Sequence, residues 1–167
     1  MDASEKSYSK LHPKRVVAAA CLVNDAEEIL LVRTHNLPNK WQPVAGGVEE
    51  GESPEQAIER EIKEELTVEA DVSRSIFNTS KPYDFGEGTV YFYTIPISPS
   101  VVASFSIDAS EIKEIKWFTL NDALRCPSYP ATAHYINEYF EWKQRSAEMA
   151  SCSVELLGKH GTSEHKP

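Results

Sequence analysis

The first apolar stretches of the chain are short and are separated by a polar turn. Residues 15–23 (RVVAAACLV) form an apolar run rich in valine, and residues 29–33 (ILLVR) form a second one. The segment between them, NDAEE at residues 24–28, supplies turn chemistry. Two short apolar runs joined by such a turn predict a β-hairpin over residues 15–33.

A helical pattern follows in the middle of the chain. Ile58, Ile62 and Leu66 recur every fourth residue, which places the three side chains on one stripe of a helix. The preceding segment 53–56 (SPEQ) contains a capping serine, a proline suited to the first helical position and a glutamine that completes a capping box. These features predict an amphipathic helix that begins within that segment.

The remaining segments mix strand and helix patterns in no regular order. Strands are expected at residues 68–77, 89–97 and 115–118, a loop or an edge strand at 101–107, a short helix at 119–125 and a longer helix at 131–149. Loops are expected at residues 34–40 and 80–88. Because strands and helices do not alternate regularly, the chain is expected to have an α+β fold rather than a doubly wound sheet.

The length of the chain indicates one domain with flexible ends. A chain of 167 residues is of the usual size for a single domain. Residues 1–14 are polar and are expected to form a flexible arm. Residues 150–167 have no periodic apolar face and are expected to form a flexible tail. The folded domain is therefore expected over residues 15–149.

Composition narrows the class of protein. Apolar residues at 41% and charged residues at 26% are ordinary for a soluble globular protein. No apolar run reaches the length of a membrane span, and the first residues lack the hydrophobic core of a signal peptide. We therefore expect a cytoplasmic protein that has no membrane partner.

The three cysteines and the net charge exclude further classes. Cys21, Cys126 and Cys152 are odd in number and widely spaced, which fits neither a disulfide framework nor a zinc cluster, and Cys21 is expected to be buried. A net charge of -9 argues against tight binding to long nucleic acid, which needs a basic footprint. A small polyphosphate remains a candidate ligand, because a bound divalent cation reverses the local field.

Three glutamates crowd one turn of the predicted helix. Glu61, Glu64 and Glu65 stand at i, i+3 and i+4, so they lie together beside the apolar stripe. Like charges at this spacing repel, and a divalent cation removes that cost; carboxylate oxygens suit Mg²⁺ or Mn²⁺. The alternative is a solvated acidic helix face, because such charge runs are common.

Glycines before the helix favour the metal site over the solvated face. Gly46 and Gly47 allow the backbone to approach the glutamates closely, and Gly51 permits a turn that folds the loop back over the helix.

The segment 46–68 resembles the Nudix box. That pattern is Gly, five residues, Glu, seven residues, Arg-Glu, an aliphatic residue, any residue, Glu-Glu, any residue, Gly and an aliphatic residue. The chain supplies Gly46, Glu52, Arg60, Glu61, Ile62, Glu64, Glu65 and Val68 at this spacing. Thr67 replaces the final glycine, which affects how the helix ends but no proposed ligand. The flanks agree, since WFTLNDAL at residues 117–124 looks like the Trp-Phe strand end and helix of the family.

The resemblance implies the Nudix α/β/α sandwich with a mixed sheet and hydrolysis of a nucleoside diphosphate linked to another moiety. It assigns Glu61, Glu64 and Glu65 as ligands of Mg²⁺ or Mn²⁺. Glu52 is implied to be an accessory ligand or a hydrogen-bonding partner within the loop.

Two further roles follow from the same resemblance. The backbone carbonyl of Gly46 is implied to be another metal ligand. Arg60 is implied to orient a glutamate through a salt bridge, while the alternative is a solvated surface arginine.

A general base must complete the site. Glu111 lies six residues before Trp117, where the resemblance places a loop glutamate with this role. Asp108, Glu114 and the glutamates of the box are alternatives, and a merely solvated Glu111 also remains open.

Several residues are candidates for binding the substrate. Trp41, Tyr83, Phe85 and Tyr91 can stack on a base, although aromatic side chains are more often used for packing. Arg33 and Lys81 can meet phosphates, and Gly47 lies beside the proposed metal site. These candidates are Arg33, Trp41, Gly47, Lys81, Tyr83, Phe85 and Tyr91.

The segments around the box favour one substrate class. The stretch WQPVAGG at residues 41–47 leans toward nucleoside triphosphates or dinucleoside polyphosphates, and Pro82 makes ADP-ribose the next candidate. No signature for NADH, coenzyme A or mRNA caps is present. A Nudix-fold sensor that binds a nucleotide without cleaving it is the main alternative. An isomerase of isoprenoid diphosphates is disfavoured, because this chain has no obvious catalytic cysteine in a suitable sequence context. Whether the protein forms a homodimer stays open.

Overall fold

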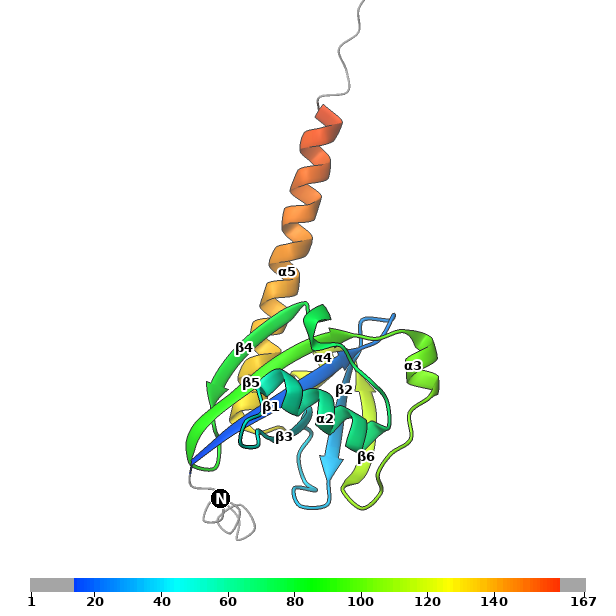
Figure 1. Cartoon of the computed structure of the whole chain (residues 1–167). Coiled ribbons are helices and arrows are strands. Elements are labelled where there is room, and N and C mark those ends of the chain that lie inside the picture. The colour runs from blue at the N-terminus through cyan, green and yellow to red at the C-terminus, as the bar shows by residue number, and fades with distance from the viewer. Residues whose placement is uncertain (1–13, 160–167) are drawn as a thin grey trace, which may run out of the picture.

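The computed structural model describes residues 14–159, and within this range one mixed sheet forms the centre of the molecule (Figure 1). The strands are β1 (Lys14–Val23), β2 (Ile29–Thr34), β3 (Val44–Gly47), β4 (Phe77–Pro82), β5 (Glu87–Pro96) and β6 (Ile112–Phe118). Their order is β4-β5-β1-β2-β6, and β3 pairs with β1. The β1–β5 pair is parallel, whereas β1–β2, β1–β3, β2–β6 and β4–β5 are antiparallel. The predicted hairpin and mixed sheet are confirmed.

Helices cover both faces of this sheet. They are α2 (Pro54–Leu66), α3 (Pro99–Ala103), α4 (Leu120–Ala123) and α5 (Pro130–Lys159), with a 3-10 turn η1 at Val72–Arg74. In Figure 1, α2 lies on one side of the strands, the first turns of α5 lie on the other side, and the rest of α5 projects away from the sheet. The α+β sandwich expected from the sequence is therefore confirmed. No helix within residues 14–159 combines the length and hydropathy of a membrane span.

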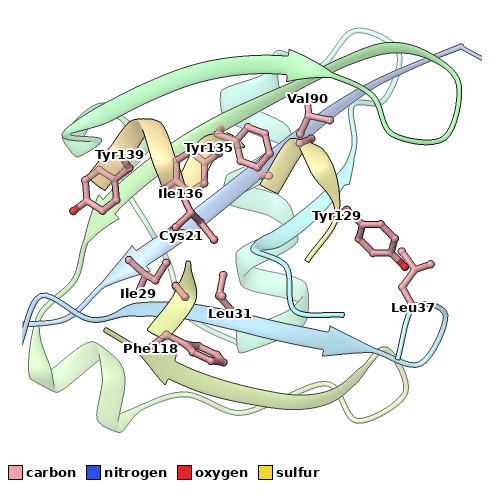
Figure 2. Close-up of a cluster of buried hydrophobic side chains, with 14 of the residues drawn as sticks. Cys21, Ile29, Leu31, Leu37, Val90, Phe118, Tyr129, Tyr135, Ile136 and Tyr139 are labelled. Carbon is pink, nitrogen blue, oxygen red and sulfur yellow. The ribbon is translucent and has the colours of Figure 1, made fainter. Parts of the chain in front are cut away.

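Strand β1 separates two hydrophobic cores because successive side chains point to opposite faces of a sheet. Ala18, Ala20 and Leu22 pack in the α2 core, whereas Ala19, Cys21 and Val23 pack in the α5 core. In the α5 core, shown in Figure 2, the rings of Phe92 and Tyr135 stack at 4.7 Å. Cys21 is buried as expected. With apolar side chains on both faces, β1 holds the two layers together.

Two segments differ from the predictions. Residues 68–77 were expected as a strand, but they contain η1, because the Asp71 side chain accepts from the Ser73 N–H and starts a turn. Strand β4 lies later and takes part of the segment expected as a loop. Residues 101–107 were expected to be a loop or an edge strand, but residues 99–103 form α3, because Ser98 caps a helix whose first position is Pro99. Residues 104–107 lie outside helices and strands. This serine–proline start is the same signal that marks α2.

The C-terminal helix is longer than predicted. Helix α5 runs past Met149 to Lys159, although residues 150–167 were expected to form a flexible tail. No proline or glycine interrupts residues 131–157, so nothing local ends the helix earlier. The flexibility expected of residues 1–13 and 160–167 lies outside the described residues.

Thr67 ends α2 in the left-handed conformation that glycine usually adopts at the end of a helix. Its φ is 62° and its ψ is 27°, and its N–H donates to the Lys63 carbonyl. The hydroxyl donates to the Ser106 carbonyl at 2.7 Å. The N–H groups of Ser106 and Asp108 donate to the Leu66 and Glu65 carbonyls at 3.0 and 2.9 Å. The loop after α3 is therefore attached to the C-terminal end of α2.

Removing the Thr67 hydroxyl is expected to loosen this attachment. Thr67→Val keeps the branched side chain and loses only the bond to Ser106, so the free energy of unfolding should fall by about 1 kcal/mol. Urea denaturation measures this change. Thr67→Ser is the matched control, because it keeps the hydroxyl and should retain wild-type stability or exceed it. Equal stability of the valine and serine variants would show that the bond contributes nothing.

Candidate active site

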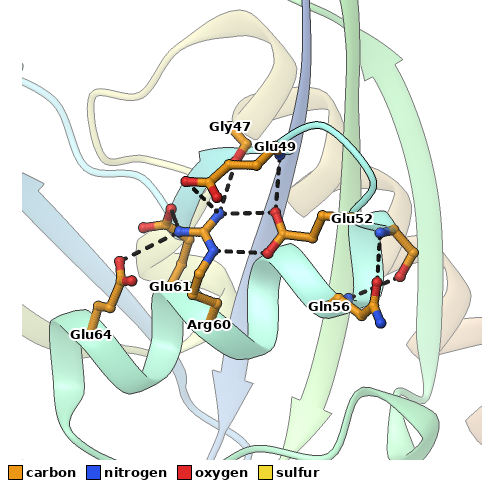
Figure 3. A network of polar contacts seen from close by, with 8 residues as sticks. Gly47, Glu49, Glu52, Gln56, Arg60, Glu61 and Glu64 are labelled. Carbon is orange, nitrogen blue, oxygen red and sulfur yellow. Dashed lines mark hydrogen bonds and ion pairs between the residues drawn. The ribbon is translucent and has the colours of Figure 1, made fainter.

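Arg60 connects the helix to the loop that precedes it, as Figure 3 shows. Its Nε and Nη2 donate to the two carboxylate oxygens of Glu52 at 2.8 and 3.1 Å. Nη2 also donates to the Gly47 carbonyl at 3.1 Å. Nη1 donates to Glu61 at 2.7 Å and lies 3.4 Å from Glu64. One planar cation thus ties together the loop and two of the three crowded glutamates.

Glu52 takes the hydrogen-bonding position rather than an open ligand position. Besides the two bonds from Arg60, its Oε2 accepts from the Glu49 N–H at 3.0 Å. The Arg60 guanidinium and this N–H lower the pKa of Glu52 to about 2, so the carboxylate stays ionised. Of the two roles proposed for Glu52, the geometry favours support of the loop.

The glycine pair makes room for two side chains on opposite faces of β3. A Cβ atom on Gly46 would lie 2.0 Å from Glu61 Cδ, and a Cβ atom on Gly47 would lie 2.4 Å from Arg15 Nη2. Any larger residue would displace one of these groups. The glycines therefore bring the backbone against a carboxylate on one side and a guanidinium on the other.

Gly46→Ala is expected to reduce catalysis while leaving the fold intact. The new methyl group would push the Glu61 carboxylate aside, and misplacement on this scale costs about 10-fold to 10²-fold in rate. Stability should change little, because the displaced atoms are the end of a flexible side chain. Turnover and melting temperature measure the two effects.

Gly51→Ala is the control for this prediction. Gly51 has φ +79°, and a Cβ atom added to it would meet no other atom within 4 Å. The substitution should therefore cost stability through backbone strain without moving Glu61. Wild-type turnover in Gly46→Ala would remove the main support for a role of Glu61 in catalysis.

Glu65 is the most unusual acid in the site. It is only 4% exposed, and its Oε2 has no hydrogen-bond partner. Burial raises its pKa to about 8, and the charges of Glu61, Glu111, Glu64 and Asp108 act in the same direction. An ionised carboxylate that is buried without a partner is costly. A bound cation would supply the missing partner.

The chemistry of these side chains fits a hard divalent cation, although they are not gathered around one point. Within residues 14–159 no three acidic, histidine or cysteine side chains form a ready cation cluster. Two of the three glutamates contact Arg60 instead. The oxygen donors of α2 and the unpartnered Oε2 of Glu65 fit Mg²⁺ or Mn²⁺.

A cavity of about 350 Å³ adjoins these acids. The acids in its wall are Glu61, Glu65 and Glu111, and the charges of Glu61 and Glu111 act on Glu65. The wall also contains Tyr83, Phe85 and Tyr129, whose rings contact one another, and Phe92. Arg15 and His35 also contribute to the wall. The cavity wall thus combines a group of acids with a group of aromatic rings.

The structure brings together most of the predicted site residues. Gly46, Gly47, Glu61, Glu65, Tyr83, Phe85 and Glu111 line the cavity. Glu52, Arg60 and Glu64 form the network beside it, and Glu64 is exposed. This arrangement agrees with the spacing of the box, which placed the acids on one turn of a helix.

Several predicted substrate-binding residues lie elsewhere. Arg33 and Trp41 are not part of the cavity lining, because Arg33 forms an ion pair with Glu114 and its guanidinium lies 4.9 Å from the centroid of the Trp41 ring. Trp41 also packs edge-on against Phe118 at 5.0 Å. Substrate binding by Arg33 or Trp41 stays a prediction.

Two other candidates also fall outside the lining. Lys81 forms an ion pair with Glu138 of α5 and does not line the cavity that contains Glu61, Glu65 and Glu111. Tyr91 is 38% exposed and does not line the cavity.

Sequence reasoning missed several residues of the cavity wall. Among them, Arg15, Asp84 and Tyr129 line the cavity but were not predicted. Asp84 lies in the sequence between Tyr83 and Phe85, which were both predicted as substrate-binding residues. This position was the signal that could have identified it. Arg15 and Tyr129 carried no local signal, because only the packing of distant segments brings them to the site.

A mixed sheet between helical layers, with a glycine-flanked acidic helix beside a cavity, agrees with the α+β sandwich that the resemblance to the Nudix box implies. The family model described as the NUDIX domain matches residues 13–140, which is most of the chain. The chain belongs to the Nudix family.

Relatives within this family include hydrolases named for NAD-capped RNA. The NAD-capped RNA hydrolase NudC of Pseudomonas aeruginosa is 31% identical over 144 residues, covering 84% of this chain and 48% of the relative. This chain spans about half the length of the NudC relatives that it matches. Nudix proteins generally use divalent metal ions.

Solved structures show the same fold. The MutT protein of Methanosarcina mazei Go1 has a TM-score of 0.64 at 22% identity, covering 79% of this chain and 96% of that one. A C. elegans Ap4A hydrolase complex has a TM-score of 0.63 at 20% identity, covering 78% of this chain and 98% of that one. At these identities the likeness concerns the fold alone.

Proposed function

We propose that the protein is a metal-dependent Nudix pyrophosphohydrolase that cleaves a diphosphate bond in a small nucleotide. The observation that carries this proposal is one cavity whose wall contains both the group of acids and the group of aromatic rings. A diphosphate beside the acids places an attached nucleoside toward the rings. Nucleoside triphosphates or dinucleoside polyphosphates are the favoured substrates, and ADP-ribose is the next candidate.

Glu61, Glu64 and Glu65 would hold Mg²⁺ or Mn²⁺ with the Gly46 carbonyl. A cation bound there neutralises diphosphate charge and lowers the pKa of water. Glu65 supplies an oxygen that has no other partner, and Gly46 leaves room for the Glu61 carboxylate. A solvated acidic helix face would need neither the unpartnered Glu65 oxygen nor the space at Gly46, so both features favour the metal site.

The remaining polar groups act on the substrate and on the acids. Glu111 lines the cavity, and its charge contributes to the raised pKa of Glu65. This proximity to the acids supports the proposed role of Glu111 as the general base that accepts a proton from the attacking water. Arg60 positions Glu61 and keeps the loop closed through Glu52. Arg15 faces the cavity from β1 and is suited to binding a phosphate oxygen.

The similar proteins are named for different substrates or activities, and these names support a nucleotide substrate. One structural neighbour is an Ap4A hydrolase and another is a MutT protein, whereas the NudC relatives act on NAD-capped RNA. NAD and NADH therefore belong in any substrate test, although the sequence carries no signature for them.

A nucleotide panel tests the proposal. It contains the nucleoside triphosphates, dinucleoside polyphosphates, ADP-ribose, NAD and NADH, each with Mg²⁺, Mn²⁺ or EDTA, and chromatography detects the products. Cleavage of one class that EDTA abolishes is the expected result. Nucleotide binding without cleavage would favour the non-catalytic sensor instead, since the fold alone does not guarantee turnover.

A further inference from the structure

The cavity wall contains, among its aromatic residues, an acidic residue with no place in the proposed chemistry. Asp84 lies in the turn between β4 and β5, flanked in sequence by Tyr83 and Phe85, and all three residues line the cavity. The Phe85 ring packs edge-on against Tyr83 at 5.7 Å and against Tyr129 at 5.1 Å. Aromatic walls of this kind suit a flat heteroaromatic ring.

A hydrogen bond to helix α5 fixes the Asp84 carboxylate. Its Oδ1 accepts from the Ala131 N–H at 3.0 Å, in the first turn of the helix. An ionised carboxylate has about four acceptor positions on its two oxygens, so capacity for a ligand remains. Burial raises the pKa of Asp84, whereas the Ala131 N–H, Lys40 and His134 oppose this shift. The carboxylate is therefore oriented and partly desolvated.

A carboxylate accepts hydrogen bonds and donates none, so it discriminates between base edges. Adenine, cytosine and guanine carry an exocyclic amino group, which donates. Uracil in place of cytosine, or hypoxanthine in place of adenine, presents a carbonyl oxygen at the same position. That oxygen would face the carboxylate with lone pairs on both sides. Sites built to bind an N–H group reject analogues that lack it.

We propose that Asp84 is a specificity-determining residue that binds the exocyclic amino group of a nucleobase held in the cavity against the aromatic residues. This inference rests on the proposed function, because it assigns the aromatic part of the cavity wall to the base. It narrows the substrate class to adenine, cytosine or guanine nucleotides over uracil and hypoxanthine nucleotides.

Asp84→Asn separates this role from a purely structural one. The asparagine Oδ1 can still accept from the Ala131 N–H, so the attachment to α5 is kept. The other half of the side chain becomes an NH₂ donor, which matches a carbonyl rather than an amino group. If Asp84 has only a structural role, the substitution should change stability alone. If Asp84 binds the amino group of the base, the substitution should change the preference between bases.

The test compares substrates that differ only by amino or oxo groups. For the wild-type protein with Mg²⁺, kcat/KM should be higher for CTP than for UTP and for ATP than for ITP, by about 10-fold or more in at least one pair. In Asp84→Asn this ratio should fall to near one or reverse, with an unchanged melting temperature. Cleavage with no preference in either protein would overturn the inference and leave the proposed function intact.

Binding supplies a second measurement that needs no turnover. Calorimetry with CMP against UMP, and with AMP against IMP, should show the same preference in the wild-type protein and its loss in Asp84→Asn. If no nucleotide is cleaved but this preference is found, the base site stands and the hydrolase proposal fails. If all four monophosphates bind equally or not at all, Asp84 does not read an amino group.

Discussion

Glu65→Gln is expected to abolish hydrolysis and, at the same time, to stabilise the metal-free protein near pH 8. The two effects have one cause, which is a buried carboxylate without a partner. Glutamine removes the negative charge that a cation would need, so turnover should fall by at least about 10³-fold. It also removes the cost of burying that charge when no cation is present.

The sign of the pH dependence follows from the raised pKa. The pKa of Glu65 is about 8 in the folded protein, against an ordinary value of 4.5 for a glutamate. Between these values the folded state holds a proton that the unfolded state has lost, so stability falls as pH rises through the window. The loss is on the order of several kcal/mol for a shift of this size. Glu61 also has a raised pKa, so the variant should keep a weaker slope.

Urea denaturation in EDTA at about pH 5 and about pH 8 measures this behaviour. The wild-type protein should lose stability over that interval, and Glu65→Gln should lose much less. Adding Mg²⁺ or Mn²⁺ should stabilise the wild-type protein but not the variant. Glu69→Gln is the control, because Glu69 is exposed and pairs with Lys63 outside the cavity. Retained turnover in Glu65→Gln would count against the metal assignment.

Glu111→Gln is expected to slow hydrolysis by about 10²-fold or more if Glu111 is the general base. The loop that carries it is fixed, because the Glu111 N–H donates to the Asp108 carbonyl at 3.1 Å and its carbonyl accepts from the His35 N–H at 3.0 Å. The substitution keeps the shape and removes the proton acceptor. The loss should appear in kcat, while substrate affinity changes little.

Glu114→Gln provides the comparison. Glu114 pairs with Arg33, and neither lines the cavity, so this variant should keep turnover close to that of the wild-type protein. The Asp108 carboxylate accepts from Ser110, and Asp108 is likewise absent from the cavity lining. A loss smaller than about threefold in Glu111→Gln would move the role of base to Asp108, Glu114 or the box.

The sequence was most informative where a short segment carries its own structure. The capping box at Ser53 and the apolar stripe of α2 needed only local spacing, and both are present in the fold. The same serine–proline start at Ser98 was overlooked, and a loop or an edge strand was expected over residues 101–107. Asp71 likewise started a turn in a segment whose composition resembled a strand.

The sequence by itself determined the acidic helix, the glycine pair before it and the first strand of the hairpin, because each depends on residues close together in the chain. Only the tertiary structure decided that Glu65 is buried without a partner and that Asp84 lies in the cavity wall together with aromatic residues. It also separated Arg33 and Trp41 from that cavity. These outcomes depend on which distant segments pack together, and packing is set by burial over the whole domain rather than by local spacing.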